Sequence, residues 1–310
     1  MILNVGTRGS KLSLIQTDIV LKNLKQIFPE LNFNIKIIKT LGDLEDEKPL
    51  FTIDRKGIFE KEINQALIHN EIDFAVHSLK DVPIFNDDEL IIAAIPKRES
   101  PLEALVSINK LKFNELPRGA IIGTSSLRRM IQIKHLRSDL EVKPMRGNID
   151  TRIKKIQEGY FHAAILSLAG LERLGFKDLA AEIFPPEVFT PPAGQGALAI
   201  VIKRDRGDLM DILKAIDHFP TRAEVTAERS LINKMQGGCH FPIGAFAKAE
   251  ENKLFLYGCI FSINGLNKIE ASAEASINEA EALGNKVANM LLSKGADEIK
   301  NEWRMKYGIW

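Results

Sequence analysis

This sequence of 310 residues lacks the features that mark several protein classes. Its two cysteines, Cys239 and Cys259, are too few for a disulfide scaffold. Its 42 basic and 41 acidic residues nearly balance, so no overall charge attracts the chain to nucleic acid or to a membrane surface. No apolar run is long enough to span a bilayer. Because Arg8 and Lys11 soon follow the apolar start, we expect no signal peptide and a cytoplasmic location.

The chain is longer than a single hydrophobic core usually allows, so two or three domains are expected. Predicted strands alternate with amphipathic helices, which favours mostly parallel sheets with ligands near the strand ends. A first α/β domain is predicted at 1–98 and 197–216, because the strand 198–202 returns to complete the first sheet. A second α/β domain is predicted at 101–192, and a small α+β domain at 220–310.

The stretch Ile121–Arg129 combines an apolar strand with a helix start rich in hydroxyl groups. Thr124 or Ser125 is placed to cap this helix by accepting a hydrogen bond from a free backbone N–H. The first turn of a helix directs unpaired N–H groups at an anion, and Arg128 and Arg129 add positive charge there. The pattern fits a carboxylate or phosphate clamp, and it also fits a capped helix with two solvated arginines.

A second helix start in the same predicted domain carries another pair of arginines. Gly147-Asn148 is a turn signal, with Arg146 before it and Arg152 in the helix that follows. Residues 123–152 hold seven Lys/Arg against three Asp/Glu, a local surplus of four positive charges.

Two further sites come from the ends of predicted elements. Ser10 is placed to cap the first helix, just after Arg8. Lys80 and Asp81 follow the strand 72–77 and precede Pro83, so they lie at the carboxyl end of a strand. Spacing alone favours a surface Lys-Asp pair, which contributes little to stability.

Cys239 follows two glycines, on a predicted loop where the backbone can approach another group closely. Three interpretations compete: an inert buried thiol, a metal ligand together with His240, and a nucleophile or covalent attachment point. A cysteine hydrolase would need a histidine from elsewhere, and His77 is the candidate. Spacing alone does not choose among these interpretations.

Six motifs occur together and in order, and they resemble the hydroxymethylbilane synthase (porphobilinogen deaminase) family over essentially the whole chain. They are Arg8-Gly9-Ser10, His77-Ser78-Leu79-Lys80-Asp81-Val82-Pro83, Gly123-Thr124-Ser125-Ser126-Leu127-Arg128-Arg129, Arg146-Gly147-Asn148, Gly194-Gln195-Gly196 and Gly237-Gly238-Cys239.

The resemblance implies two periplasmic-binding-protein-like α/β domains around a cleft and a small α+β C-terminal domain. It implies a transferase of haem and porphyrin biosynthesis that carries a dipyrromethane cofactor in thioether linkage to Cys239. Four porphobilinogen molecules are joined head to tail to this primer with loss of ammonia, and hydrolysis then releases the tetrapyrrole hydroxymethylbilane. We expect a monomer without metal, nucleotide, nucleic-acid or membrane partners.

The resemblance also implies roles for individual residues. The implied catalytic residue is Asp81, whose carboxylate stabilises the cationic azafulvene formed when ammonia leaves and handles protons. Cofactor contacts are implied for Ser78, Lys80, Asp81, Thr124, Ser126, Arg128, Arg129, Arg146 and Gly147. Substrate contacts are implied for Arg8, Ser10, Arg146, Arg152, Arg173 and Gln195. The arginines suit this chemistry because a guanidinium binds a carboxylate through two parallel hydrogen bonds.

The chain departs from the family pattern in the predicted loop 42–57 and just before it. Leu41 stands where family members often have a basic residue, Thr52 near a common lysine, and Asp54-Arg55 where glycines are common, whereas Lys56 and Gly57 match. We therefore expect this loop to make different contacts over the cleft. Two rival functions are a solute receptor, which would need no Cys239, and a cysteine hydrolase, which would keep Cys239 reactive.

Overall fold

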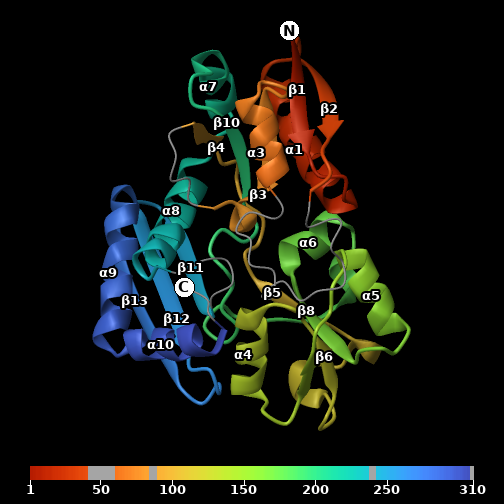
Figure 1. Ribbon diagram of the computed structural model, residues 1–310, viewed down its shortest axis with the longest axis vertical. Coiled ribbons are helices and arrows are strands. Elements are labelled where there is room, and N and C mark those ends of the chain that lie inside the picture. Colours follow the sequence, from red (N-terminus) through yellow and green to blue (C-terminus); the bar gives the residue numbers. More distant parts are fainter. Residues whose placement is uncertain (41–59, 84–88, 237–241, 308–310) are drawn as a thin grey trace. The chain divides into compact units, whose positions relative to one another are not determined.

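The computed structural model describes residues 1–40, 60–83, 89–236 and 242–307 (Figure 1). They form two compact units. The first contains the described residues from Met1 to Glu99, together with Gly196–Arg222. The second contains Ser100–Gln195 and the described residues from Ala223 onward. The boundaries predicted for three domains stay a prediction.

The first unit is built on a five-stranded sheet. Its order is β2 (Asn32–Ile37), β1 (Ile2–Thr7), β3 (Phe74–Ser78), β10 (Leu198–Lys203) and β4 (Leu90–Ala94). The strands β2, β1 and β3 are parallel, and β10 is antiparallel to both of its neighbours. The prediction that residues 198–202 complete the first sheet is therefore confirmed.

Helices cover both faces of this sheet. Alternate residues of β1, such as Leu3 and Val5, pack with α1 (Lys11–Ile27) and α7 (Gly207–Lys214). On the opposite face, a Cβ added at Gly6 would lie 3.4 Å from the Ile63 side chain of α3 (Lys61–Ile68). The Ser13 N–H donates to Ser10 Oγ at 3.2 Å, so the predicted cap of α1 is confirmed.

The chain leaves β3 through one 3₁₀ turn, η2 (Leu79–Asp81). Leu79 is fully buried, and its carbonyl accepts from the Val82 N–H at 3.1 Å. This buried anchor fixes the turn, so Lys80 and Asp81 lie directly beyond the carboxyl end of β3, as predicted.

The second unit contains a sheet with the same pattern of strand directions. Its order is β7 (Glu141–Lys143), β6 (Ile121–Gly123), β8 (Ala163–Ser167), β5 (Glu103–Ser107) and β9 (Ala180–Ile183). The first three strands are parallel, and β5 is antiparallel to both neighbours. Helix α4 (Leu127–Leu136) packs on one face, whereas α5 (Ile149–Gln157) and α6 (Leu168–Arg173) pack on the other.

The rest of the second unit is the predicted α+β part. An antiparallel sheet has the order β11 (Ile243–Glu250), β12 (Lys253–Phe261) and β13 (Lys268–Ser276). Its core is shared with α8 (Phe219–Lys234), α9 (Ala280–Ser293) and α10 (Ala296–Tyr307), whereas β13 and α10 had no predicted counterpart. Leu127 and Ile131 of α4 join this core, so α4 lies between the two parts of the unit.

These observations establish the fold class as α/β, with two five-stranded sheets and a small α+β C-terminal part. The likeness to periplasmic binding proteins stays a prediction. Four more 3₁₀ turns complete the described elements, η3 (Ile108–Lys110), η4 (Phe113–Glu115), η5 (Lys177–Leu179) and η6 (Ile277–Glu279). Within the described ranges, every helix is too short or too polar to cross a bilayer.

Trp303 provides a test of the C-terminal core. Its side chain is fully buried, and Nε1 donates to the Phe261 carbonyl at 2.8 Å. Trp303→Ala should lower the free energy of unfolding by ~3–5 kcal/mol, because it leaves a large cavity and an unpaired carbonyl. Met305→Ala, on the same helix at 82% exposure, should change it by less than ~0.5 kcal/mol. Denaturant unfolding followed by far-UV circular dichroism measures both; equal effects would contradict this account of the core.

Candidate active site

The start of α4 differs from the prediction in its capping residue. The cap is Ser126, whose Oγ accepts from the Arg129 N–H at 3.4 Å, and not Thr124 or Ser125. Thr124 Oγ1 instead accepts from the Ser126 N–H at 3.1 Å, and Ser125 Oγ donates to the Met145 carbonyl at 3.0 Å. Thr124 and Ser125 therefore stabilise the turn, whereas Ser126, directly before the helix, caps a free N–H of its first turn.

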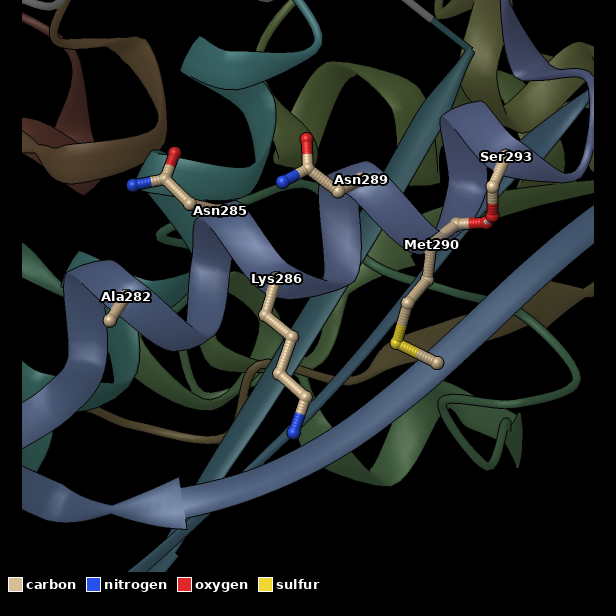
Figure 2. A pocket seen from close by; sticks show the side chains of 6 residues that line it. All are labelled: Ala282, Asn285, Lys286, Asn289, Met290 and Ser293. Atoms are coloured by element: carbon tan, nitrogen blue, oxygen red, sulfur yellow. Dashed lines mark hydrogen bonds between the residues drawn. The ribbon is translucent and has the colours of Figure 1, made fainter.

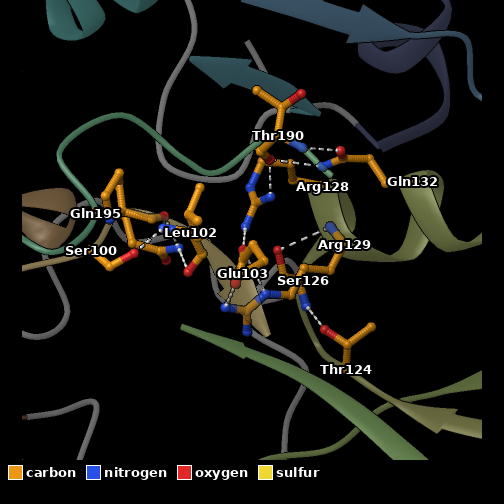
Figure 3. Close-up of polar contacts among 11 residues, drawn as sticks. Ser100, Leu102, Glu103, Thr124, Ser126, Arg128, Arg129, Gln132, Thr190 and Gln195 are labelled. Carbon is orange, nitrogen blue, oxygen red and sulfur yellow. Dashed lines mark hydrogen bonds and ion pairs between the residues drawn. The ribbon is translucent and has the colours of Figure 1, made fainter. Parts of the chain in front are cut away.

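Arg128 and Arg129 are not solvated (Figure 3). Both donate to Glu103, a fully buried carboxylate on β5. Arg129 binds it through Nε at 3.0 Å and Nη2 at 2.7 Å, and Arg128 also donates to the Thr190 carbonyl. Sequence reasoning missed Glu103 because nothing local marks this strand residue as an ion-pair partner.

This pairing leaves the buried cluster with one surplus positive charge. Burial lowers the pKa of Arg128, the Glu103 carboxylate opposes that shift, and the charge of Arg129 adds to it. The two arginines therefore lie in a preorganised, charge-rich position. Their predicted role as cofactor ligands stays a prediction, since Glu103 already occupies part of their hydrogen-bonding capacity.

A second group of cations lies close to Arg129. Burial, followed by the charges of Arg129 and Arg146, lowers the pKa of Arg152 to about 10. Arg152 Nε donates to the Gly147 carbonyl at 2.8 Å, which fixes the guanidinium beside the predicted turn. Gly147 has φ of +108°, a conformation that favours glycine. The guanidinium of Arg152 is thus repelled by those of Arg129 and Arg146, and a carboxylate ligand beside it would relieve this repulsion.

Gln195 and Arg173 occupy other parts of the second unit. The Gln195 side chain is fully buried, and its Nε2 donates to the Pro101 carbonyl at 2.7 Å. That contact gives Gln195 a structural role, so substrate binding by this residue stays a prediction. Arg173 is the last residue of α6.

Three predicted residues of the first unit line one small polar cavity of about 20 Å³: Arg8, Ser78 and Asp81. Ser78 Oγ and the Gln16 side chain are hydrogen-bonded, with Gln16 Nε2 2.9 Å from Ser78 Oγ. Lys80 lies in the same 3₁₀ turn as Asp81, and Ser10 caps the helix that carries Gln16. The full lining is Arg8, Ser13, Gln16, Glu60, Val76, His77, Ser78 and Asp81.

Sequence reasoning missed Gln16, Glu60 and His77 as members of this cavity. Gln16 is 4% exposed and Glu60 is also 4% exposed, and a polar residue on the apolar side of a predicted helix was an available signal for Gln16. Burial, with a smaller effect from the charge of Arg8, lowers the pKa of His77 to about 4. His77 is therefore neutral at physiological pH.

The two cysteines differ in what can be described. Cys259 is fully buried and its Sγ donates to Thr190 Oγ1 at 3.1 Å; burial raises the pKa of this thiol. It is therefore an unreactive core residue. Cys239 lies outside the described residues, as do Leu41, Thr52 and the predicted loop 42–57.

One other hollow lies on the outer face of α9 (Figure 2). It contains none of the predicted site residues, and Lys286 is the charged member of its lining. The described parts of the chain contain no group of three or more His, Cys, Asp or Glu side chains suited to a metal ion. The expectation of a metal-free site stays a prediction.

Comparison with known proteins extends over nearly the whole chain. Residues 3–211 match the family model "Porphobilinogen deaminase, dipyromethane cofactor binding domain", and residues 222–293 match "Porphobilinogen deaminase, C-terminal domain". A probable porphobilinogen deaminase of Nitrosopumilus maritimus is 43% identical over 306 residues, covering 99% of this chain and 98% of the relative. The porphobilinogen deaminase of Brevibacillus brevis is 46% identical over 299 residues, covering 96% of both chains.

Among solved structures, the chain is similar to substrate binding domain 2 of Lactococcus lactis GlnP in its open conformation. The TM-score is 0.42 and the sequence identity is 11%, with 69% of this chain and 87% of that chain covered.

Glu103→Gln tests the buried ion pair. The substitution keeps the size of the side chain but leaves two buried guanidinium groups without a countercharge, so the free energy of unfolding should fall by ~3–5 kcal/mol. Glu141→Gln is the control, because Glu141 is paired with Lys143 at the surface and its loss should change stability by less than ~1 kcal/mol. Denaturant unfolding measures both variants, and a Glu103→Gln effect as small as the control would show that the pair is not a main source of stability.

Proposed function

The chain belongs to the porphobilinogen deaminase family, and we propose that Asp81 and the arginines of the two units carry out that family's reaction in this protein. The protein is a transferase of tetrapyrrole biosynthesis with hydroxymethylbilane synthase activity. It condenses four porphobilinogen molecules head to tail on a dipyrromethane cofactor, with loss of ammonia, and releases hydroxymethylbilane by hydrolysis.

The observation that carries the residue assignment is the polar cavity beyond β3. Asp81 lines it together with Arg8 and Ser78. Ser78 is the last residue of β3, Asp81 lies in the turn after it, and Arg8 follows β1. A carboxylate fixed by a 3₁₀ turn and held beside a guanidinium is positioned for charge stabilisation without large rearrangement.

Asp81 acts on the substrate in two ways. Its carboxylate lies beside the pyrrole N–H and balances the positive charge that develops when ammonia leaves porphobilinogen. The same oxygen atoms accept a proton from the ring carbon after coupling. Lys80, one residue earlier in the turn, contacts the cofactor from the same strand end.

The arginines bind the carboxylates of the substrate and cofactor. Each porphobilinogen carries an acetate and a propionate, so the growing chain accumulates negative charge. The repulsion of Arg152 by Arg129 and Arg146 supports this assignment, because bound carboxylates would offset it. The full proposed set of carboxylate ligands is Arg8, Arg128, Arg129, Arg146, Arg152 and Arg173, with Ser10, Ser78, Thr124, Ser126, Gly147 and Gln195 as neighbouring contacts.

The cofactor attaches through Cys239. The sequence has two cysteines, and the buried, hydrogen-bonded thiol of Cys259 is unsuited to a thioether with a large anionic group. When bound, dipyrromethane supplies the pyrrole carbon to which the first porphobilinogen is joined. The cation cluster of the second unit fits such a group, since its charge is opposite to that of the cofactor carboxylates.

We also infer that the protein acts in the cytoplasm as a monomer, without nucleic-acid or membrane partners. The near balance of 42 basic and 41 acidic residues supports this inference, because it offers no general attraction to polyanions. No observation favours the solute receptor or the cysteine hydrolase over the family's reaction.

Asp81→Asn should lower kcat by roughly 10²–10⁴-fold, because the amide neither balances the developing charge nor accepts the proton. Cofactor content and melting temperature should stay near those of the unchanged protein. Asp139→Asn is a matched control, since Asp139 is a partly exposed carboxylate that pairs with Arg137 and does not line the cavity. Steady-state product formation measures both variants, and a near-normal rate for Asp81→Asn would remove this residue from the mechanism.

Cys239→Ser should abolish covalent attachment of the cofactor. Intact-mass spectrometry of the chain, purified and then incubated with porphobilinogen, should show the dipyrromethane adduct on the unchanged protein and the bare mass for Cys239→Ser. Cys259→Ala serves as the control and should keep the adduct, because its thiol is buried in the core. An adduct that persists on Cys239→Ser and disappears from Cys259→Ala would reverse the assignment.

A further inference from the structure

The cavity beyond β3 contains one polar atom that its surroundings leave unsatisfied. His77 is 7% exposed, and its Nε2 atom has no hydrogen-bond partner among the described residues. A buried polar group without a partner destabilises the folded state, so native proteins usually satisfy such atoms through side chains or ordered water. His77 is thus an exception that calls for a ligand.

The cavity has the size and chemistry for one small polar molecule. Its volume is about 20 Å³, above the roughly 10–15 Å³ that a single water requires. Its lining offers several hydrogen-bonding groups besides His77, including the Asp81 carboxylate, the Ser78 hydroxyl and the Gln16 amide. A buried water typically makes about three hydrogen bonds, and these groups can supply them.

We propose that this cavity binds one water molecule between His77 Nε2 and the Asp81 carboxylate, and that this water is the one consumed when the product is released. The inference rests on the role proposed for Asp81. It assigns His77 as a positioning residue, which acts by holding water beside the carboxylate.

The established reaction makes this assignment specific to one step. Joining porphobilinogen units releases ammonia and consumes no water, whereas release consumes one water. The hydroxyl of that water bonds to the methylene carbon of the departing chain, as the bond from this carbon to the primer breaks. The remaining proton of the water ends on the primer carbon that keeps the bonding electrons, and Asp81 carries it there. Atoms and charge balance without a further reactant.

The neutral state of His77 suits this role. The buried imidazole stays uncharged at physiological pH, so its Nε2 exchanges a hydrogen bond with water without adding a second cation beside Arg8. An imidazolium there would instead compete with the substrate for the Asp81 carboxylate.

Three substitutions at position 77 test the proposal. His77→Leu removes the hydrogen-bonding atom, His77→Gln places an amide near the position of Nε2, and His77→Asn places one nearer to the other ring nitrogen. High-resolution crystal structures of the resting, cofactor-loaded proteins give a readout that does not depend on activity. We expect an ordered water within hydrogen-bond distance of residue 77 in the unchanged protein and in His77→Gln, and none in His77→Leu or His77→Asn. An empty cavity in the unchanged protein would overturn the proposal.

Rapid mixing of the loaded enzyme with porphobilinogen, followed by acid quench and intact-mass spectrometry, gives the second readout. His77→Leu should form the complexes with one to four added units at near-normal rates, and the complex with four units should accumulate. Release should slow by roughly 10²-fold, as expected when a reacting group loses its position, and His77→Gln should restore most of it.

Equal slowing of every addition, or release at the normal rate from His77→Leu, would overturn the role of the water. Far-UV circular dichroism and melting temperatures of the three variants separate these outcomes from misfolding. Failure of the proposed function looks different: Asp81→Asn would then turn over at a normal rate, whatever the result at position 77.

Discussion

The buried pairing of Glu103 with Arg128 and Arg129 is the interaction on which the second unit depends. Three ionised groups lie in the interior, and this is tolerable only because the carboxylate satisfies both guanidinium groups at once. The same arrangement connects β5, α4 and the loop that contains Thr190. Arg128 donates to the Thr190 carbonyl, which also accepts from the Gln132 side chain of α4, and the Thr190 N–H donates to that side chain. The residues that neutralise the buried charges are therefore also the residues that hold these parts of the chain together.

Thr190 extends these contacts into the C-terminal part of the unit. Its hydroxyl accepts from Cys259 on β12, and a Cβ added at Gly244 of β11 would lie 2.5 Å from its own Cβ. The close approach explains why β11 carries a glycine there. Because α4 also contributes Leu127 and Ile131 to the C-terminal core, the helix that carries the arginines is packed on two sides. A guanidinium group on such a helix loses little conformational entropy when it binds a ligand.

Periodicity predicted the return of the chain into the first sheet and many of the strands and helices, though not β13 or α10, because such patterns depend on neighbouring residues. The cap of α1 was predictable for the same reason: Ser10 is the one hydroxyl residue directly before the helix. Three hydroxyl residues precede α4, and the sequence could not show which of them caps the helix, because this depends on the number of residues in the turn. The partners Glu103 and Arg129 are 26 residues apart and meet only through an antiparallel strand inserted beside β8.

The candidate site shows the same division. Motifs identified Arg8, Ser78 and Asp81 individually, but their meeting in one cavity depends on β1 and β3 being adjacent in the sheet. Likewise, Arg129 and Arg146 repel Arg152 because β6 and β7 are neighbours and place two helix starts together. His77 could be recognised as unsatisfied only in three dimensions, since the residue type alone does not reveal a missing partner.

The two five-stranded sheets share one topology and differ at the end of one strand. In both, the central parallel strand leads into a helix start with hydroxyl and arginine residues: Arg8 to Ser10 after β1, and Thr124 to Arg129 after β6. The next parallel strands differ. After β3 the chain forms a 3₁₀ turn that presents Lys80 and Asp81, whereas after β8 it enters α6 directly with the buried Leu168 and Ala169.

The corresponding position of the second sheet is thus filled by hydrophobic core, and the carboxylate that pairs with Arg128 and Arg129 is Glu103 of β5. In the proposed site the acid Asp81 comes from the turn after β3 of the first sheet, whereas Arg129, Arg146 and Arg152 follow β6 and β7 of the second. Glu103 offsets the charge of Arg128 and Arg129 and leaves a surplus of one positive charge among these three groups. The 3₁₀ turn after β3 is therefore the local difference between the two similar sheets that presents Asp81, the proposed catalytic acid.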